Sequence, residues 1–263
     1  MSIAAWKLLF QSVRGTAHQR SNQPCQDSCL TRLRCTPQGL VLLLACADGA
    51  GSARHAEIGA ALACREVLRL VQQDLDEGLS LDAVEQNTAV SWYLRVRQRL
   101  QQQAELLRVD LAHLACTLLL AVVGERSSVF AQVGDGVMVV RDGEEYRIVF
   151  WPQTGEYANT THFVTDADLA EQMAFELRPT PVDELALLTD GLQTLALHYA
   201  THSVHQPFFR PMFERLRASS GREGLPDALR QFLDSAAVNA RSDDDKTLIL
   251  ATRASSRAST HPV

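Results

Sequence analysis

The feature that most constrains this fold is an apolar run that ends in an acid. Residues 39–47, GLVLLLACA, are apolar at every position after the first glycine, so a strand formed by them must be buried on both faces. The run leads directly into Asp48 and the glycine-rich turn DGAGS. The chain must therefore cover both sides of a sheet while it presents a carboxylate at the end of a buried strand.

The other hydrophobic patterns predict an α+β fold. A first strand is expected where Trp6, Leu8 and Phe10 alternate, and helical spacing predicts helices over residues 53–75 and 81–109. Three runs with glycine-bearing turns then indicate consecutive antiparallel strands: CTLLLAVVG, SSVFAQVG and GVMVVRDGEEYRIVFW. A strand, two helical segments and a last strand follow. This order lacks the regular βαβ alternation of a parallel sheet, which favours layered sheets with segregated helices.

The chain is expected to form one domain. No internal repeat or linker is visible, so we assign residues 1–253 to a single domain. The small polar residues at 254–263 are expected to be a disordered tail. Residues 152–181 begin with the polar segment PQTGEYANTTH, and we expect them to form a mobile flap over the functional site.

Charge and hydropathy argue against two classes of partner. The net charge is −6, whereas nucleic-acid phosphates and anionic lipids attract clustered Lys and Arg. The first residues lack the basic start and long apolar core of a signal peptide, and no run reaches the roughly 18 apolar residues of a membrane helix. We therefore expect a cytoplasmic protein with no nucleic-acid and no membrane partner.

The six cysteines do not predict a metal site or a disulfide framework. Three of them lie inside apolar runs and are expected in the core: Cys46, Cys64 and Cys116. The other three, at positions 25, 29 and 35, lie near His18 in sequence but lack the paired C-x-x-C spacing of a zinc site. A cytosolic chain is also kept reduced, which disfavours disulfides.

Five aspartates stand in short motifs, and most of these motifs adjoin apolar strands. They are Asp27 in PCQDSC, Asp48 in ACADGAGS, Asp135 in VGDGV, Asp190 in LLTDGL and Asp244 in SDDDK. Taken singly, an Asp-Gly pair is more often a turn, and SDDDK is more often a solvated loop. The joint pattern is harder to explain in that way, because several strands that end in Asp would gather their carboxylates at one edge.

Gathered carboxylates need a partner. Two of them about 4 Å apart repel by about 4 kcal/mol at an effective dielectric constant near 20, so the cluster requires cations or protons. Oxygen-only ligands select Mg²⁺ or Mn²⁺ over zinc. Two such ions can lower the pKa of a bound water and orient it for in-line attack on phosphorus. The residues thus favour a metal-dependent hydrolase of phosphate esters.

Five blocks, in this order, resemble the successive motifs of the metal-dependent serine/threonine protein phosphatases of type 2C. They are GTAHQRSNQPCQDS, ACADGAGS, VGDGVMVV, LLTDGL and DDDKTLILA, and they span residues 15–251. The first two are similar to a bacterial branch of the family. The resemblance implies a four-layer α-β-β-α sandwich, in which two antiparallel sheets are flanked by helices. It also implies hydrolysis of phosphoserine and phosphothreonine by direct attack of a metal-activated water.

The resemblance also implies a ligand set for Mn²⁺ or Mg²⁺, two ions per chain. By this likeness Asp48 bridges both ions and the Gly49 carbonyl binds one of them. Asp190 and Asp244 bind the other ion. Asp135 matches the position associated with a third, weaker ion, to which Asp190 would also contribute.

Two further assignments rest on the same likeness. Asp27 is the residue that holds metal-bound waters. The last family block reads Asp, then Asn or Asp, then any residue, then Thr, which fits the four residues from Asp244 to Thr247. Asp243 is therefore the less favoured register.

The sequence departs from the family pattern around the phosphate. Many relatives carry Glu before the first aspartate, and this chain has Gln26. Many carry an Arg that grips the phosphate five residues before that aspartate, where this chain has Asn22. Some relatives have a His after the second Asp-Gly as a proposed general acid, where this chain has Ala50. The third block reads Gly-Asp-Gly rather than Gly-Asp-Ser. These changes leave the expected metal ligands intact.

Other residues are candidates for the missing roles. Arg20, Arg14 or His18 could bind the phosphate, and Arg20 is our assignment. His18 is also the candidate catalytic acid, since a histidine can protonate a leaving alkoxide near neutral pH. A structural role for His18, with a hydrogen bond to Asp27 or to nearby backbone, is favoured over the catalytic one. His55 is expected at the surface.

Three functions stay open at this point. The leading one is a phosphoprotein phosphatase whose substrate is a phosphorylated protein, with a cognate Ser/Thr kinase. The missing Arg and His motivate a second, a poorly active regulatory or scaffold module of the same fold. The third is a hydrolase of small phosphate esters.

Overall fold

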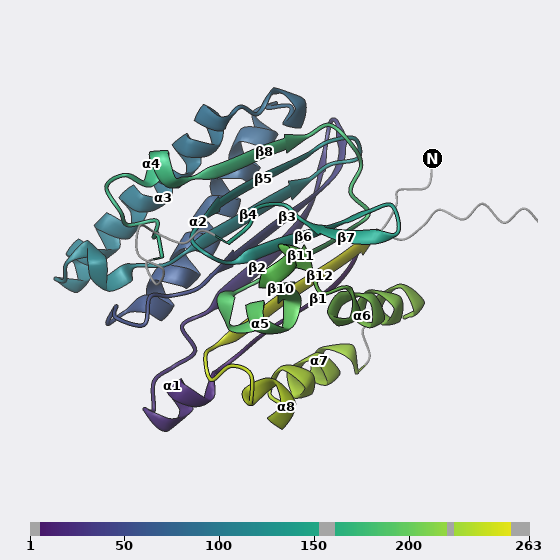
Figure 1. Cartoon of the computed structure of the whole chain (residues 1–263). Coiled ribbons are helices and arrows are strands. Elements are labelled where there is room, and N and C mark those ends of the chain that lie inside the picture. The colour runs from purple at the N-terminus through teal and green to yellow at the C-terminus, as the bar shows by residue number, and fades with distance from the viewer. Residues whose placement is uncertain (1–5, 153–160, 220–223, 254–263) are drawn as a thin grey trace, which may run out of the picture.

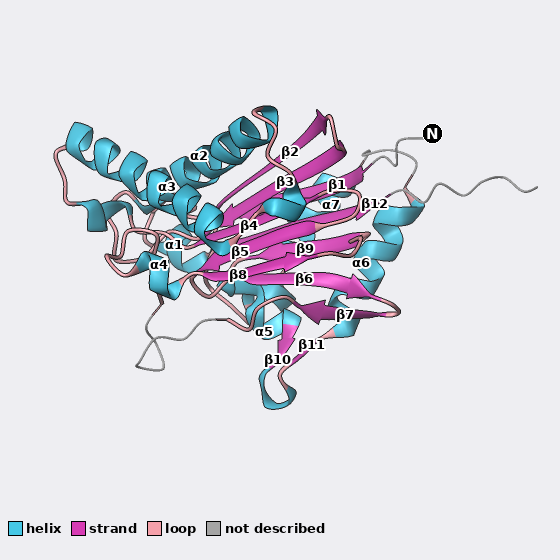
Figure 2. Cartoon of the chain, turned by 90° about the horizontal axis from the view of Figure 1, so that it is seen from above, coloured by secondary structure: helices cyan, strands magenta, loops and turns pink. Residues whose placement is uncertain are grey.

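The computed structural model describes residues 6–152, 161–219 and 224–253 and shows two sheets packed face to face (Figure 1). Helices cover the outer face of each sheet, as the second view also shows (Figure 2). The expected α+β, α-β-β-α sandwich is therefore confirmed. The predicted tail at 254–263 and residues 153–160 of the predicted flap lie outside the described residues.

Both large sheets are antiparallel throughout. The first sheet contains, in spatial order, β1 (Trp6–Val13), β12 (Lys246–Arg253), β9 (Glu184–Leu188), β6 (Val137–Asp142) and β7 (Glu145–Ile148). The second contains β2 (Ser28–Thr36), β3 (Gly39–Ala47), β4 (Leu118–Val123), β5 (Ser128–Val133) and β8 (Ala174–Arg178). A separate small hairpin pairs β10 (Leu197–His198) with β11 (Ser203–Val204).

Two pairs of helices form the outer layers. The second sheet is covered by α2 (Ala56–Asp76) and α3 (Gln86–Leu107), and the first by α6 (Gln206–Ala218) and α7 (Leu225–Leu233). The short helices are α1 (Thr16–Arg20), α4 (Leu169–Gln172), α5 (Gln193–Ala196) and α8 (Ala236–Asn239). Four 3₁₀ turns are η1 (Leu81–Ala83), η2 (Leu111–Leu114), η3 (Asp190–Leu192) and η4 (Tyr199–Thr201). Within the described ranges, no helix combines the length and apolarity needed to cross a bilayer.

Strand β3 explains why the sandwich has four layers. Its side chains alternate between two buried clusters, as pleated geometry requires. Leu42 and Leu44 pack between the two sheets, whereas Leu43 and Ala45 pack beneath α2 and α3. Both faces are fully buried, as the unbroken apolar run predicted. The hydrophobic effect on both sides of this strand fixes the sheet between a helical layer and a second sheet.

The largest difference between the expected and the observed helix boundaries lies at the start of the second helix. The second helix begins at Gln86 rather than near residue 81, because residues 81–83 form η1 and Val84 is extended. Its Leu94 is 46% exposed. The first helix ends at Asp76, close to Gly78 with its positive φ of 101°, as expected for a helix stop.

Two predictions about the strands were wrong. Strands β5 and β6 are not neighbours, because the chain crosses from the second sheet to the first at residues 134–136. Residues 169–178 are not part of a flap. They form α4 and then β8, which pairs with β5 and completes the edge of the second sheet. The partly apolar sequence AFELR lets this edge strand pack on α3.

Candidate metal centre

A cavity of about 320 Å³ opens where loops from both sheets meet. Asp48 follows β3 of the second sheet, and Asp135 lies in the crossover from β5 to β6. Asp190 follows β9 and Asp244 precedes β12, both in the first sheet. All four line the cavity together with Gly49. The acids that the sequence placed at strand ends therefore do converge, although they are far apart along the chain.

Asp48 is fixed by the strand beside it. Its backbone N–H donates to Thr117 Oγ1 at 2.9 Å, and the Thr117 N–H donates to the Asp48 carbonyl at 2.8 Å. Gly49 makes a bridge to Cys116, and a Cβ placed on Gly49 would lie 2.6 Å from the Cβ of Ala56. The turn can therefore pass close to the start of α2 only because residue 49 is a glycine.

A second glycine brings Asp190 to the loop before β12. A Cβ on Gly191 would lie 2.0 Å from the Asp245 carbonyl oxygen. Thr189 and Thr247 join the same two segments, because the Thr247 N–H donates to Thr189 Oγ1 at 3.0 Å. This close approach brings Asp190 beside the loop that carries Asp244, and both side chains line the cavity.

Asp27 lies behind the cavity wall. Its Oδ2 accepts hydrogen bonds from the hydroxyls of Thr189 and Thr247, each at 2.7 Å. Its Oδ1 is buried and has no partner among the described residues. Burial raises the pKa of Asp27 to about 7, although the two threonine hydroxyls act in the opposite direction.

The other acids disfavour one another's charge. Burial raises the pKa of Asp48 well above its ordinary value, and the neighbouring Asp27 and Asp190 raise it further. The pKa of Asp190 is raised to about 7, first by burial and then by Asp135 and Asp244. Burial also raises the pKa of Asp135, which accepts a hydrogen bond from Thr161. Without a cation, the cavity therefore favours protonated carboxyl groups.

His18 has a partner that the sequence did not indicate. Its Nδ1 lies 2.9 Å from Asp245 Oδ2, not from Asp27. The Asp245 carboxyl also accepts the backbone N–H groups of Gly15 and Gln26, each at 2.6 Å. Asp245 is 1% exposed, so this buried carboxyl joins α1, the Gln26 loop and β12. The sequence offered only the run SDDDK as a signal, and that run does not say which acid points inward.

Arg20 lies outside the cavity wall. Its Nη2 lies 2.8 Å from Asp243 Oδ2, and both side chains are more than half exposed. Asp243 lines the cavity beside Asp244, so Arg20 reaches the rim only through this ion pair. Asn22, which replaces the expected Arg, has a φ of 55°, a left-handed conformation that Asn tolerates better than a long side chain. Arg14 donates to the Gln23 carbonyl.

Some wall residues were not predicted as site residues. Ala17, Thr161 and Phe163 line the cavity, and Gln26 presents a buried Oε1 with no partner among the described residues. His55, which was expected at the surface, does not line this cavity; it directly precedes α2, and its side chain makes no capping hydrogen bond there. All six cysteines are free thiols, with Cys46, Cys64 and Cys116 buried as predicted.

The residues present fit a hard divalent cation. The donors are carboxylate and carbonyl oxygens, and the buried Oδ1 of Asp190 lacks a partner among the described residues. In these ranges no three His, Cys, Asp or Glu side chains already form a complete ligand set. Mg²⁺ and similar ions keep several of their waters, however, so a site that offers each ion fewer than three side-chain ligands can still hold it.

Sequence comparison identifies relatives. A family model described as protein phosphatase 2C matches residues 14–234. The chain is 38% identical over 251 residues to serine/threonine-protein phosphatase 3 of Escherichia coli K12, with 94% of this chain and 98% of that protein aligned.

Solved structures share the fold at lower identity. A bacterial serine phosphatase matches with a TM-score of 0.60 and 19% identity, over 97% of this chain and 100% of that chain. Stp1 from Staphylococcus aureus, a serine/threonine phosphatase, matches with a TM-score of 0.57 and 19% identity, over 96% and 97% of the two chains. The catalytic domain of PstP, solved with two manganese ions, matches with a TM-score of 0.60 and 16% identity, over 95% and 99%.

Proposed function

Because this chain belongs to the protein phosphatase 2C family and is a serine/threonine phosphoprotein phosphatase, we propose that the acidic cavity is its catalytic centre and binds divalent cations. The observation that carries this proposal is the convergence of aspartates from both sheets around one opening. We assign Asp48, the Gly49 carbonyl, Asp190 and Asp244 to two Mn²⁺ or Mg²⁺ ions. We assign Asp135 to a third, weaker ion.

When bound, such ions lower the pKa of water and offset the negative charge of the phosphoryl group. The residues of the chain hold and orient the reactants around them. Asp27 suits the orientation of a water molecule, because Thr189 and Thr247 occupy its Oδ2 and leave Oδ1 free to accept a hydrogen bond. Its buried position also keeps that oxygen in one place.

The leaving oxygen of serine or threonine needs a proton. His18 lines the cavity, and its Nδ1 is engaged by Asp245, so Nε2 is the ring nitrogen left for a substrate oxygen. We assign proton delivery to this Nε2. Asp245 is then a positioning residue, since a carboxylate on one ring nitrogen fixes both the ring orientation and the tautomer.

Arg20 stays our candidate for phosphate binding. Its guanidinium is exposed and held by Asp243 at the cavity rim. A phosphate dianion that enters the cavity would compete with Asp243 for this cation, and Arg suits bidentate phosphate recognition. The cognate kinase, the cytoplasmic location and the single domain over residues 1–253 also stay predictions.

The test measures phosphate release from p-nitrophenyl phosphate and from a phosphoserine peptide, with Mn²⁺ and with EDTA. We expect release that requires Mn²⁺, abolition by Asp48→Asn, and near-normal release in the control variant Asp243→Asn. Release that persists in EDTA, or in Asp48→Asn with Mn²⁺, contradicts the assignment. No release from either substrate favours a scaffold, and faster release from nucleotides or sugar phosphates favours a small-ester hydrolase.

A further inference from the structure

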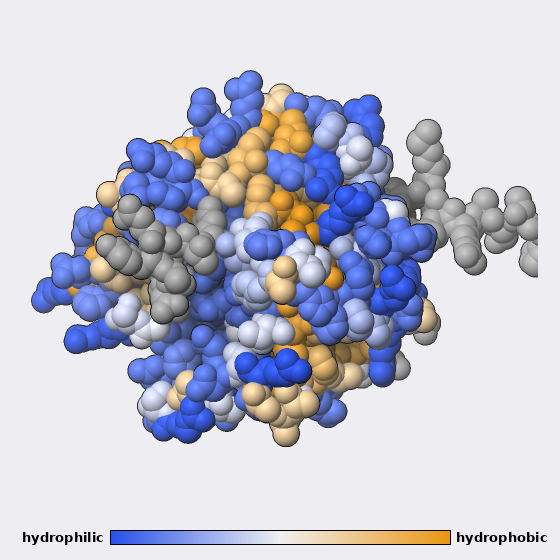
Figure 3. Space-filling model, in the orientation of Figure 1, coloured by the Kyte–Doolittle hydropathy of each residue, from blue (hydrophilic) through white to orange (hydrophobic). Residues whose placement is uncertain are grey.

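The protein has a second, larger cavity on the opposite side of the first sheet from the sheet–sheet interface. Its volume is about 470 Å³, which lies in the range of small-molecule binding sites. Leu9 of β1 forms its floor, and its walls include Met212 of α6 and Leu229 of α7. Orange, apolar side chains reach the surface in this region, near the places of α6 and α7 in Figure 1 (Figure 3).

The packing of the two helices explains the gap. Both α6 and α7 pack on β1, but they make little contact with each other. Their aromatic contact is between Phe208 and Phe232, whose ring centroids are 6.2 Å apart. Phe232 is 40% exposed even though it lies on the apolar side of α7. Pro211 interrupts the backbone hydrogen bonds of α6 at this wall.

The polar side chains that line the cavity are basic residues, and no described acidic side chain lies among them. Among the described residues that line the cavity, every side chain other than His205 and Arg215 is apolar. The Arg215 side chain makes no ion pair or hydrogen bond with any described residue. The next arginine on the same helix, Arg217, is by contrast paired with Glu184. An apolar cavity with an exposed guanidinium at its rim, which pairs with none of the described residues, is complementary to an apolar molecule that carries a single negative charge.

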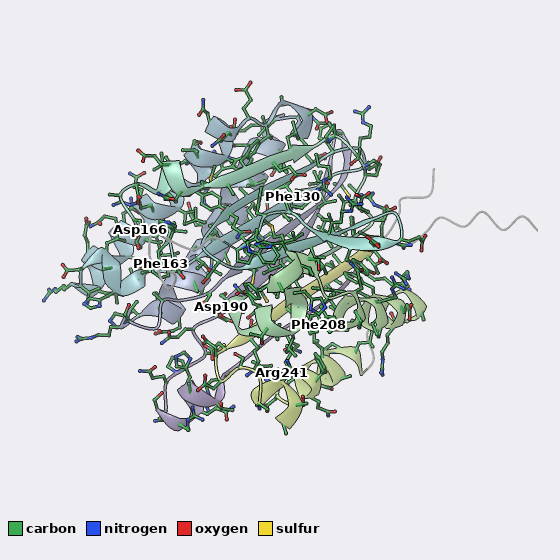
Figure 4. The ribbon with its side chains drawn as sticks, in the orientation of Figure 1. Phe130, Phe163, Asp166, Asp190, Phe208 and Arg241 are labelled. Carbon is green, nitrogen blue, oxygen red and sulfur yellow. The ribbon has the colours of Figure 1, made fainter. Side chains whose placement is uncertain are left out.

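The cavity wall is continuous with the catalytic centre. Leu195 lines the cavity from α5, and α5 follows directly on η3, which begins at Asp190. His205 holds α5 through two hydrogen bonds. Its ring Nδ1 lies 2.9 Å from the Leu195 carbonyl oxygen, and its backbone N–H donates to the Ala196 carbonyl at 2.8 Å. In Figure 4, Phe208 of the cavity wall lies on the same side of the sheets as this segment (Figure 4).

The segment also reaches a second acid of the centre. Gln193, the first residue of α5, donates from Nε2 to the Asp135 carbonyl at 2.5 Å. A molecule that displaces Leu195 or His205 therefore moves a segment that holds two of the assigned ligand residues. No other contact of the cavity is needed to connect the two sites.

We propose that the cavity between α6, α7 and β1 binds an apolar small molecule with one anionic group, such as a medium-chain carboxylate, and that this binding changes phosphatase turnover through α5. The binding part stands on the cavity and Arg215 alone. The coupling part rests on the proposed function, because it acts on Asp190 and Asp135.

Binding is tested without metal and without turnover. Decanoate, decan-1-ol and decyltrimethylammonium, each below its micelle concentration, are titrated against the full chain in EDTA by displacement of an anilinonaphthalene sulfonate dye. We expect decanoate to bind at least tenfold more tightly than the alcohol, and the cation to bind most weakly. Arg215→Gln should remove the preference for decanoate, whereas Arg210→Gln, on the same helix but outside the cavity, should keep it.

Three outcomes overturn the binding part. Equal binding of the three probes shows an apolar groove with no anion selectivity. Unchanged decanoate binding in Ala228→Trp, which fills the cavity, shows that the probe binds elsewhere, provided that circular dichroism shows a folded variant. If no probe binds and the chain sediments as a dimer that Phe232→Glu dissociates, a second copy covers the groove.

Coupling is tested on p-nitrophenyl phosphate with Mn²⁺. Saturating decanoate should change kcat at least twofold in the native chain and in Arg210→Gln, but not in Arg215→Gln at the same concentration. Bound decanoate that leaves kcat and KM unchanged overturns the coupling part. A chain that binds decanoate but shows no metal-dependent turnover at all refutes the proposed function instead, and leaves the binding site in place.

Discussion

Replacing Asp190 with Asn should change protein stability in opposite directions with and without metal. In the metal-free protein the charge of this carboxylate is opposed by burial and by Asp135, Asp244 and Asp27, which together raise its pKa from 3.8 to about 7. Each pKa unit is worth about 1.4 kcal/mol, so the ionised group costs about 4 kcal/mol at most above pH 7. Relaxation and water entry reduce this penalty, and we expect Asp190→Asn to stabilise the metal-free protein by about 1–3 kcal/mol at pH 8.

With saturating Mn²⁺, the native chain should instead be more stable than Asp190→Asn. A cation present at a hundred times its dissociation constant stabilises the native chain by about 2.7 kcal/mol, and the amide of Asp190→Asn gives up most of that gain. The assay is thermal unfolding at pH 8 in EDTA and in Mn²⁺, where 1 kcal/mol corresponds to about 2–4 °C for a chain of this size.

The matched control for this experiment is Asp243→Asn. Asp243 lines the same cavity, but it is 63% exposed and loses only its surface ion pair with Arg20. Its unfolding temperature should change little in either condition, because exposed pairs contribute less than about 1 kcal/mol. The reasoning is refuted if Asp190→Asn is less stable than the native chain in EDTA, or if both variants respond equally to Mn²⁺.

The remaining predictions concern pH, backbone packing and the His18 pair. The pKa values of Asp27 and Asp190 in the folded protein are raised to about 7. Between pH 4 and 7 the folded, metal-free chain therefore binds more protons than the unfolded chain, and its unfolding temperature should fall as the pH rises through that window. An unfolding temperature that does not change with pH contradicts this prediction. Gly191→Ala should lower the free energy of unfolding by about 2 kcal/mol or more and weaken Mn²⁺ binding, because the new Cβ would lie 2.0 Å from a carbonyl oxygen. In the control variant Gly51→Ala the new Cβ meets nothing within 4 Å, so the unfolding temperature should stay unchanged. His18→Gln should slow p-nitrophenyl phosphate, whose leaving group needs no proton, less than a phosphoserine peptide; equal losses would leave His18 with a structural role only.

Sequence patterns predicted most of the fold because the apolar runs were unambiguous. An unbroken run such as residues 39–47 can be satisfied only by burial on both faces, and β3 is buried in that way. The same logic placed Asp48 and Asp190 at strand ends that meet. Residues 169–178 were misassigned to a flap, because nothing local in a short edge strand shows that β5 offers it a partner.

The details of the site depend on contacts that sequence does not encode locally. In the run SDDDK, Asp243 is exposed, Asp244 lines the cavity and Asp245 is buried. Three identical side chains thus take three environments, and the buried one is selected by the backbone N–H groups of Gly15 and Gln26 together with the His18 ring. The ion pair between Arg20 and Asp243 is likewise a tertiary contact across more than two hundred residues of sequence.

The most direct measurement is anomalous diffraction from crystals soaked in Mn²⁺. The account predicts anomalous peaks inside the cavity of about 320 Å³, within coordination distance of carboxylate oxygens of Asp48, Asp190 and Asp244. A cavity without anomalous signal at millimolar Mn²⁺, or signal only on acids outside this cavity, would contradict the assignment of the catalytic centre.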